Sequence, residues 1–247
     1  MVLKENKTLP NIFMEGRKKD ILEVIVKEHV STGSPVGSSF LVEKCKLNCS
    51  SATVRNVMAE LEEEGYIMQP HTSAGRVPTE KAYNLFLEEL QKGQKHLKKL
   101  REKELKDLDD SLVDFEESSL REAAKALAAI TNSAVFWAFH KNNLYYTGLS
   151  NLFQQPEFAN SGLVYNISAV IDRMDEIIDQ VFEKVGEEPQ ILIGEENPFG
   201  NFCGSILAKY RHGNQTGMLG ILGPMRMDYE RNLGVVEHIL SKLRIKN

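Results

Sequence analysis

Residues 50–65, SSATVRNVMAELEEEG, constrain the fold most strongly, because the signals for both ends of a helix stand within them. Ser50 and Ser51 suit the start of a helix, where a side-chain oxygen accepts hydrogen bonds from free backbone N–H groups. Gly65 suits the left-handed conformation that ends a helix. Between these ends, apolar residues recur every three or four positions: Val54, Val57, Met58 and Leu61. The pattern predicts one helix with a single buried face.

Two helices are predicted before this one, and a hairpin is predicted after it. The apolar stripe of residues 17–32 stops before Gly33, and a short second helix is expected over about 38–45. After the third helix, residues 66–70 and 76–79 are predicted as short strands joined by the polar loop QPHTSAG. Three helices followed by a hairpin are the order of a winged helix-turn-helix. We therefore expect a DNA-binding domain of this type over residues 15–90, with the third helix in the major groove.

The outer side of the third helix carries residues that suit DNA. Ala52 and Ala59 are small enough for close approach, and the helix start offers N–H groups and a positive dipole end to phosphate. The amide of Asn56 suits adenine, and the guanidinium of Arg55 suits guanine or phosphate, so these two are expected to read bases. The alternative is that these side chains are only solvated and that Ser50 is only a helix cap.

The polar loop of the hairpin is predicted to be the wing. Gly75 permits close backbone approach, and Arg76 is expected to contact phosphate or the minor groove. The alternative is a plain hairpin turn. The predicted DNA-binding residues of the helices and the wing are Ser38, Ser50, Ser51, Ala52, Thr53, Arg55, Asn56, His71, Thr72, Ser73, Gly75 and Arg76.

The charge balance argues against a protein that merely coats nucleic acid. The chain has 30 Lys and Arg against 35 Asp and Glu, a formal net charge of -5, whereas non-specific binding relies on a cationic surface. In the third helix, acidic residues gather at the end away from the expected DNA: Glu60, Glu62, Glu63 and Glu64. That segregation permits sequence-specific binding by an acidic domain.

The location predicted from the sequence is cytoplasmic, with no membrane partner. No apolar run approaches the roughly 18 to 20 residues that span a bilayer, and the N-terminus lacks the features of a signal peptide. Cys45, Cys49 and Cys203 suit neither a disulfide framework nor a zinc site, so three reduced thiols are expected. No cofactor and no metal are expected.

The second half of the chain has a different texture. Residues 91–132 are charged and glycine-poor, and they predict one or two amphipathic helices, packed on their own domain or forming a coiled-coil seam between subunits. From Ser133 onward, aromatic and β-branched segments predict about five mostly antiparallel strands, with a helix over residues 163–185 and a closing helix over 228–243. This is an α+β pattern. Residues 1–14 are polar and patternless, and we expect them to be disordered.

Enzymatic activity is not expected. His140, His212 and His238 are far apart in the sequence, and the chain contains no nucleophile elbow, P-loop, zinc-protease motif or dinucleotide-binding motif.

Several motifs resemble those of the HrcA family of bacterial heat-inducible transcription repressors. They are GSPVGSSF, SSATVRNVMAELEEEGY and PHTSAGRVPT in the first half, and GLSNLFQQPEF, GEENP and GMLGILGPMRMDYER in the second. The resemblance implies a homodimer that represses chaperone genes from an inverted-repeat operator known as CIRCE and is released on heat stress, with the chaperonin GroEL as a further partner. It also implies a GAF-like second domain. The expected fold is an α+β multidomain chain, with a winged helix-turn-helix over 15–90, a helical linker or dimer helix over 91–132, and a GAF-like regulatory domain over 133–247.

The chain departs from the family pattern at three places. Ser39 replaces a commonly basic residue, and Val57 replaces a commonly acidic or amide residue. Between residues 141 and 142 the family usually carries a long segment with part of the GAF-like sheet and an inserted dimerisation domain. In this chain His140 to Leu144 are instead predicted to form a short turn. Dimerisation is therefore expected through the helices of 91–132 or an edge of the sheet.

A ligand-sensing winged-helix regulator is the alternative function, because GAF-like domains often bind small molecules. The run GMLGILGPM with Arg226 and Asp228 would then line a pocket. The same residues also fit a core strand and the N-cap of the last helix.

Overall fold

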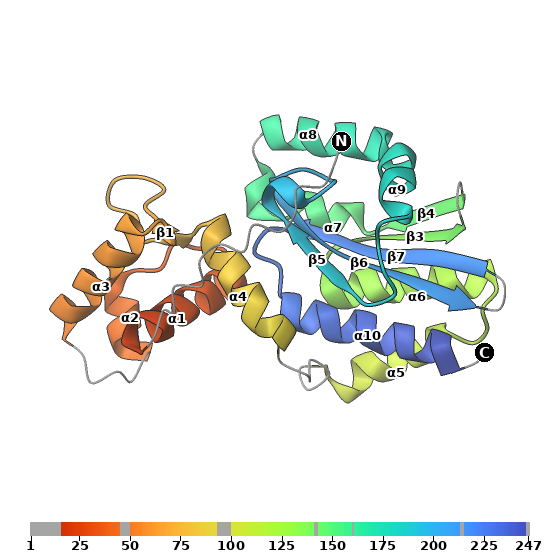
Figure 1. Ribbon diagram of the computed structural model, residues 1–247, viewed down its shortest axis with the longest axis horizontal. Coiled ribbons are helices and arrows are strands. Elements are labelled where there is room, and N and C mark those ends of the chain that lie inside the picture. Colours follow the sequence, from red (N-terminus) through yellow and green to blue (C-terminus); the bar gives the residue numbers. More distant parts are fainter. Residues whose placement is uncertain are drawn as a thin grey trace. The chain divides into compact units, whose positions relative to one another are not determined.

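The computed structural model of the chain describes residues 16–44, 50–92, 100–140, 143–159, 161–212 and 215–245. Its contacts divide the chain into two compact units, Met1–Ala82 and Tyr83–Asn247, and each is described by itself (Figure 1). The predicted disordered segment 1–14, Cys45, Cys49 and residues 141–142 of the predicted turn lie outside the described residues.

In its described residues, the first unit contains three helices, a hairpin and the start of a fourth helix. They are α1 Arg17–Thr32, α2 Ser38–Lys44, α3 Ser51–Glu63, β1 Ile67–Met68, β2 Val77–Pro78 and α4 Glu80–Lys92. This order confirms the one predicted from the sequence. α1 ends where Gly33 adopts a left-handed φ of 67° and its N–H donates to the His29 carbonyl at 2.8 Å. Gly65 follows α3 with a φ of 75°.

The core of the first unit draws on all three helices and the hairpin. Its buried side chains are Ile21, Leu22, Ile25, Val26, Val36, Leu41, Val54, Met58, Leu61, Tyr66 and Ile67. Full burial of such an aliphatic side chain stabilises a fold by about 1.5–3 kcal/mol. α3 packs against α1 and α2, so its apolar side is fixed and its polar side remains at the surface.

The second unit is a sheet with helices on both faces. Its described elements are α5 Glu102–Ser111, α6 Glu117–Thr131, β3 Ala134–His140, β4 Asn143–Thr147, α7 Leu149–Phe153, η2 Pro156–Ala159, α8 Ser161–Asp172, α9 Met174–Phe182, β5 Gln190–Ile193, η3 Gly194–Glu196, β6 Cys203–His212, β7 Gln215–Pro224 and α10 Tyr229–Ile245. The strand order is β4-β3-β7-β6-β5, and each neighbouring pair is antiparallel. The predicted α+β class and the predicted antiparallel sheet are confirmed.

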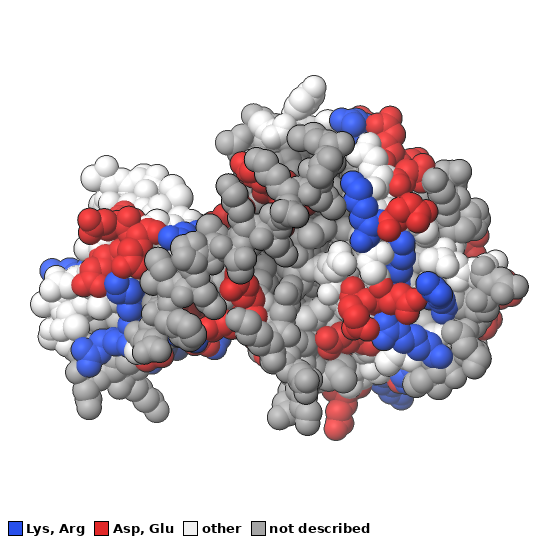
Figure 2. Space-filling model, viewed as in Figure 1, with Lys and Arg blue, Asp and Glu red and all other residues white. Residues whose placement is uncertain are grey.

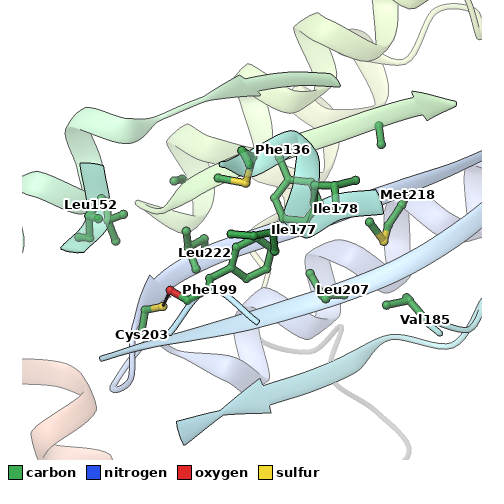
Figure 3. Packing of buried hydrophobic residues seen from close by; sticks show 14 of the residues in the cluster. Phe136, Leu152, Ile177, Ile178, Val185, Phe199, Cys203, Leu207, Met218 and Leu222 are labelled. Carbon is green, nitrogen blue, oxygen red and sulfur yellow. Dashed lines mark hydrogen bonds between the residues drawn. The ribbon is translucent and has the colours of Figure 1, made fainter. Parts of the chain in front are cut away.

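The two faces of the sheet are covered by different helices. α7, α8 and α9 lie on one face, and α6 and α10 lie on the other, with α5 against α6 and α10 (Figure 1). The first face holds a cluster that includes Phe136, Phe199, Leu207 and Leu222 (Figure 3). Gly220 lies opposite Phe136 in the neighbouring strand, and a Cβ there would meet the ring. Glycine therefore leaves the space that the Phe136 ring occupies.

The structure differs from the sequence-based expectation at two places in this unit. The single helix predicted over residues 163–185 is wrong, because the chain breaks at Arg173, whose φ of -111° and ψ of 16° are not helical. Ile167 of α8 and Met174 of α9 both pack in the apolar cluster on this face of the sheet. The turn predicted over residues 140–144 is shorter in the structure, because β3 extends to His140 and β4 begins at Asn143. Of the two arrangements left open for the helices of 91–132, packing on their own domain agrees with α5 and α6, which pack within the second unit, with α6 against β3 and β4.

Candidate nucleic-acid interface

The start of α3 is capped by Ser50. Its Oγ accepts a hydrogen bond from the backbone N–H of Thr53 at 3.2 Å and lies 3.0 Å from the Thr53 hydroxyl. This geometry confirms the predicted N-cap. Ser51 and Ala52 are exposed in the first turn. N–H groups of a first turn have no partner within their helix and lie at its positive dipole end, so this surface suits an anion.

α3 turns its apolar side inward and its polar side outward. Val54, Met58 and Leu61 are buried, and Val57, which was predicted to be buried, is half-buried. The exposed residues are Ser51, Ala52, Arg55, Asn56 and Ala59, with Thr53 half-buried at their edge. Arg55 Nη2 approaches Ser51 Oγ only at 3.5 Å, a weak contact that leaves the guanidinium at the surface. Ser38 begins α2 and is half-buried.

The acidic end of α3 contacts cations of the same unit. Lys18 Nζ lies 2.8 Å from a Glu60 oxygen and 2.7 Å from a Glu64 oxygen. The hydrogen bonds that Lys18 donates to these carboxylates raise its pKa above the ordinary value. Lys81 Nζ donates to the Glu64 carbonyl at 2.8 Å. Acidic and basic side chains therefore lie side by side on this unit (Figure 2).

The loop between β1 and β2, which was predicted to be the wing and keeps that name below, has an exposed, uncharged tip. The tip consists of His71, Thr72 and Ser73, and Ser73 adopts a left-handed φ of 69°. The Ala74 N–H donates to the His71 carbonyl at 3.0 Å, and the Gln69 side-chain amide donates to the Ala74 carbonyl at 3.0 Å. With His neutral, no charged side chain occurs from residue 69 to residue 75, and the loop is a white protrusion on the first unit in Figure 2.

Gly75 and Arg76 form the base of the wing and contact the chain itself. The Val36 N–H donates to the Arg76 carbonyl at 2.8 Å, and the Arg76 N–H donates to the Val36 carbonyl at 2.9 Å. A Cβ on Gly75 would come within 2.5 Å of the Val36 carbonyl carbon and within 2.9 Å of the Gly37 nitrogen. The close backbone approach predicted at Gly75 is therefore an approach to residues 36–37.

The Arg76 guanidinium is paired with Glu62. Its Nε donates to Glu62 Oε2 at 2.9 Å, and its Nη2 lies 2.8 Å from the same oxygen. The Arg76 side chain is 23% exposed and the Glu62 side chain 35%. Sequence reasoning treated Arg76 as a contact to DNA and missed Glu62. The two residues stand 14 positions apart on different elements, and no helical or strand spacing connects them.

The residues proposed to line a ligand pocket are engaged within the second unit. Arg226 Nη2 donates to Glu157 Oε2 at 3.2 Å and to Gln155 Oε1 at 3.0 Å. Asp228 Oδ1 accepts a hydrogen bond from the Arg231 N–H at 3.1 Å, so the predicted N-cap of the last helix is confirmed. Residues 217–224 of β7 are buried, which confirms a core strand. Arg226 also joins two of the sequence motifs, because Glu157 belongs to GLSNLFQQPEF.

Other ionisable or nucleophilic side chains of the second unit have partners or are buried. His238 Nε2 lies 2.7 Å from Asp109 Oδ1, and Lys242 Nζ donates to Asp109 Oδ2 at 2.8 Å. Burial raises the pKa of the Cys203 thiol to about 12, which suppresses the reactive thiolate. Among the residues that the structure describes, no group of His, Cys, Asp and Glu is arranged to hold a metal ion. Over the same residues, no helix is long and apolar enough to cross a bilayer.

Comparison with known proteins identifies related sequences. A family model described as "HrcA protein C terminal domain" matches residues 47–233. The chain is 26% identical to the heat-inducible transcription repressor HrcA of Carboxydothermus hydrogenoformans, over 93% of this chain and 96% of that protein. A protein of the same name from Acidothermus cellulolyticus is 60% identical over 77 residues, which are 31% of this chain and 23% of that protein. One from Thermobifida fusca is 37% identical, over 74% of this chain and 54% of that protein.

The alignment with the C. hydrogenoformans protein is longer than this chain. It extends over 331 positions, whereas the chain has 247 residues, so at least 84 positions, the difference between the two, have no counterpart here. Among solved structures, a crystal structure of a hypothetical protein has a TM-score of 0.74 and 20% identity, covering 94% of this chain and 98% of that one. This structural likeness shows the fold alone.

Proposed function

Since the chain belongs to the HrcA family of heat-inducible transcription repressors, we propose that it represses heat-shock genes by binding operator DNA through its first unit. Residues 15–90 are proposed as a winged helix-turn-helix, with α3 in the major groove and the wing tip beside it. The single observation that carries this proposal is the division of α3 into a buried apolar side and an exposed side with Arg55 and Asn56.

The electrostatics of α3 support the proposed orientation. Its N-terminal half presents a capped helix start and an exposed guanidinium, both of which attract phosphate. Its C-terminal half presents Glu60 and Glu64, which Lys18 holds from within the same unit. An orientation with the N-terminal half toward the duplex therefore places positive potential near DNA and keeps the carboxylates at the far end.

The remaining parts of the proposal concern the second unit and the assembly. We propose a GAF-like regulatory domain over residues 133–247, to which α6 is added by its packing on the sheet and α5 by its packing on α6 and α10. We further propose a homodimer on an inverted repeat, loss of the active form on heating, and GroEL as a partner. The support for the operator, the heat response and GroEL is membership of the family.

The dimer is proposed to form through the β4 edge of the sheet. β4 is the outermost strand beside β3, and its Tyr146 is 44% exposed. An uncovered edge presents unpaired backbone groups to another strand. The alternative interface in α5 and α6 is less suitable, because α6 already packs against the sheet and α5 already packs against α6 and α10.

A titration of DNA tests the proposed interface. A labelled inverted-repeat duplex, selected from a randomised library with the full chain, would be titrated by fluorescence anisotropy. Arg55→Ala should weaken binding by about 1–3 kcal/mol, which is about 5- to 150-fold, and should relax the sequence preference.

Arg17→Ala is the matched control for that titration. Arg17 is an exposed arginine of the same unit, next to Lys18 and hence near the acidic end of α3. Arg17→Ala removes the same charge as Arg55→Ala but lies outside the proposed DNA face. The affinity for the duplex should therefore change by less than about twofold. If Arg55→Ala and Asn56→Ala both behave like Arg17→Ala, α3 does not read the operator.

A further inference from the structure

We propose that Arg76 and Glu62 form a positioning pair that holds the wing against α3, and that the Arg76 guanidinium does not itself bind phosphate. This inference rests on the DNA-binding function proposed above. It assigns Arg76 a role different from the one that its place in a polar wing loop predicts. It also leaves the neutral tip of His71, Thr72 and Ser73 as the part of the wing that reaches DNA.

Three contacts converge at the base of the wing. The main chain of Arg76 makes two hydrogen bonds with Val36, at 2.8 and 2.9 Å. Gly75 lies so close to Val36 and Gly37 that a Cβ would overlap their backbone atoms. The Arg76 side chain then reaches α3 through Glu62. Arg76 therefore connects the wing, the segment before α2 and α3.

The geometry of the ion pair favours a structural role for Arg76. Its Nε and Nη2 both contact Glu62 Oε2, at 2.9 and 2.8 Å, and both side chains are partly buried. A phosphate bound at this guanidinium would approach the Glu62 carboxylate and would be repelled by it. Moving the guanidinium outward would instead leave the half-buried carboxylate without its partner, which costs free energy.

The two roles of Arg76 predict opposite effects of Glu62→Gln on DNA affinity. If Arg76 binds phosphate, loss of the neighbouring negative charge strengthens binding. If the pair positions the wing, loss of the charge loosens the wing and weakens binding. Glu63→Gln is the control, because this substitution removes the same charge at the next residue of α3, which is exposed.

The first measurement is therefore the operator affinity of Glu62→Gln relative to Glu63→Gln, by anisotropy with the full chain. We expect affinity about fivefold weaker for Glu62→Gln, the size of the net contribution of one ordinary hydrogen bond. Affinity equal to or stronger than that of Glu63→Gln would overturn the positioning role.

The second measurement is the salt dependence of binding by Arg76→Ala and Arg76→Lys. A lost phosphate contact would reduce the slope of log K against log salt by about 0.9. We expect both variants to bind more weakly than wild type but with the wild-type slope, because both lose the contact with Glu62 and neither loses a phosphate contact. Arg76→Lys is included because lysine keeps the charge but lacks the Nε donor. A reduced slope for Arg76→Ala together with wild-type binding by Arg76→Lys would identify Arg76 as a phosphate contact and refute the proposal.

The third measurement needs no DNA and separates this inference from the proposed function. Amide hydrogen exchange of Val36 and Arg76 reports the bridge at the base of the wing. Glu62→Gln should accelerate exchange at these two amides, and Glu63→Gln should leave it unchanged. Unchanged exchange in Glu62→Gln overturns the positioning pair even if the wild-type chain binds its operator. Absence of wild-type binding to any selected duplex overturns the proposed function while the exchange result still reports on the pair.

Discussion

Replacing Gly75 with alanine is expected to open the base of the wing. The new Cβ would lie 2.5 Å from the Val36 carbonyl carbon, 2.6 Å from its oxygen and 2.9 Å from the Gly37 nitrogen. Carbon atoms in favourable contact stand about 3.5–4.0 Å apart, and these three neighbours are backbone atoms that no rotamer change can move. The wing and the segment before α2 must therefore separate.

The expected cost follows from the contacts that the separation breaks. The two Val36–Arg76 hydrogen bonds, of 2.8 and 2.9 Å, contribute about 0.5–1.5 kcal/mol each. If the backbone instead keeps these two hydrogen bonds, the remaining steric overlap costs about 1–3 kcal/mol. Only one of these two costs applies, so they are not summed. Alanine restricts the unfolded chain, which offsets about 0.4–1 kcal/mol. The net loss in the free energy of unfolding of the first unit is then about 0–2.6 kcal/mol, with a central value of about 1.3 kcal/mol.

Urea unfolding followed by far-UV circular dichroism, together with amide exchange at Val36, measures this loss. The single tryptophan, Trp137, is buried in the second unit, so its fluorescence reports that unit and should keep its midpoint. Gly37→Ala is the matched control, because a Cβ there meets only Ser39 Oγ at 3.7 Å. If Gly75→Ala and Gly37→Ala agree within about 0.5 kcal/mol, the steric argument is wrong.

Three further predictions address other parts of the molecule. Ser50→Ala should destabilise the first unit by about 1 kcal/mol in urea unfolding, because α3 loses its cap, and equal stability of Ser50→Ala and Ser51→Ala would contradict this. Burial opposes ionisation of Asp109, but its hydrogen bonds from Lys242 and His238 lower its pKa overall. Stability from this contact should thus be present above about pH 4 and lost as pH falls through the lower folded-state pKa. Amide exchange measures the loss as weaker protection of α5. Asp109→Asn should show the same weaker protection already at neutral pH. Tyr146→Lys should convert the proposed dimer to a monomer in light scattering, and a persistent dimer would exclude the β4 edge.

The elements that sequence reasoning predicted well are those with local signals. α3 begins after the Ser50 cap and is followed by a left-handed Gly65, as its sequence indicated. The five strands of the second unit were predicted from β-branched and aromatic runs, and the structure confirms them. The helix over residues 163–185 was mispredicted, because an apolar stripe continues through Arg173 in the sequence although the chain changes direction there.

Among the predicted DNA-binding residues, too, those with local sequence signals were placed correctly. Arg55 and Asn56 were placed on the exposed side of α3 by helical periodicity, and they lie there. Arg76 was assigned to DNA because its neighbours are polar and small. Its partner, Glu62, stands on another element, and a sequence pattern does not connect residues that are brought together only by folding.

The amino-acid sequence alone established the order of the helices and strands of the first unit, the five strands of the sheet, the exposed side of α3 and membership of its family, because caps, periodicity and motifs act between residues close in the chain. Folding alone established that α6 packs on the sheet with α5 against α6 and α10, that Gly75 lies against Val36, and that Arg76 pairs with Glu62. These contacts depend on distances between separate elements. Such distances follow from how whole apolar faces pack, and packing is a property of the complete three-dimensional arrangement.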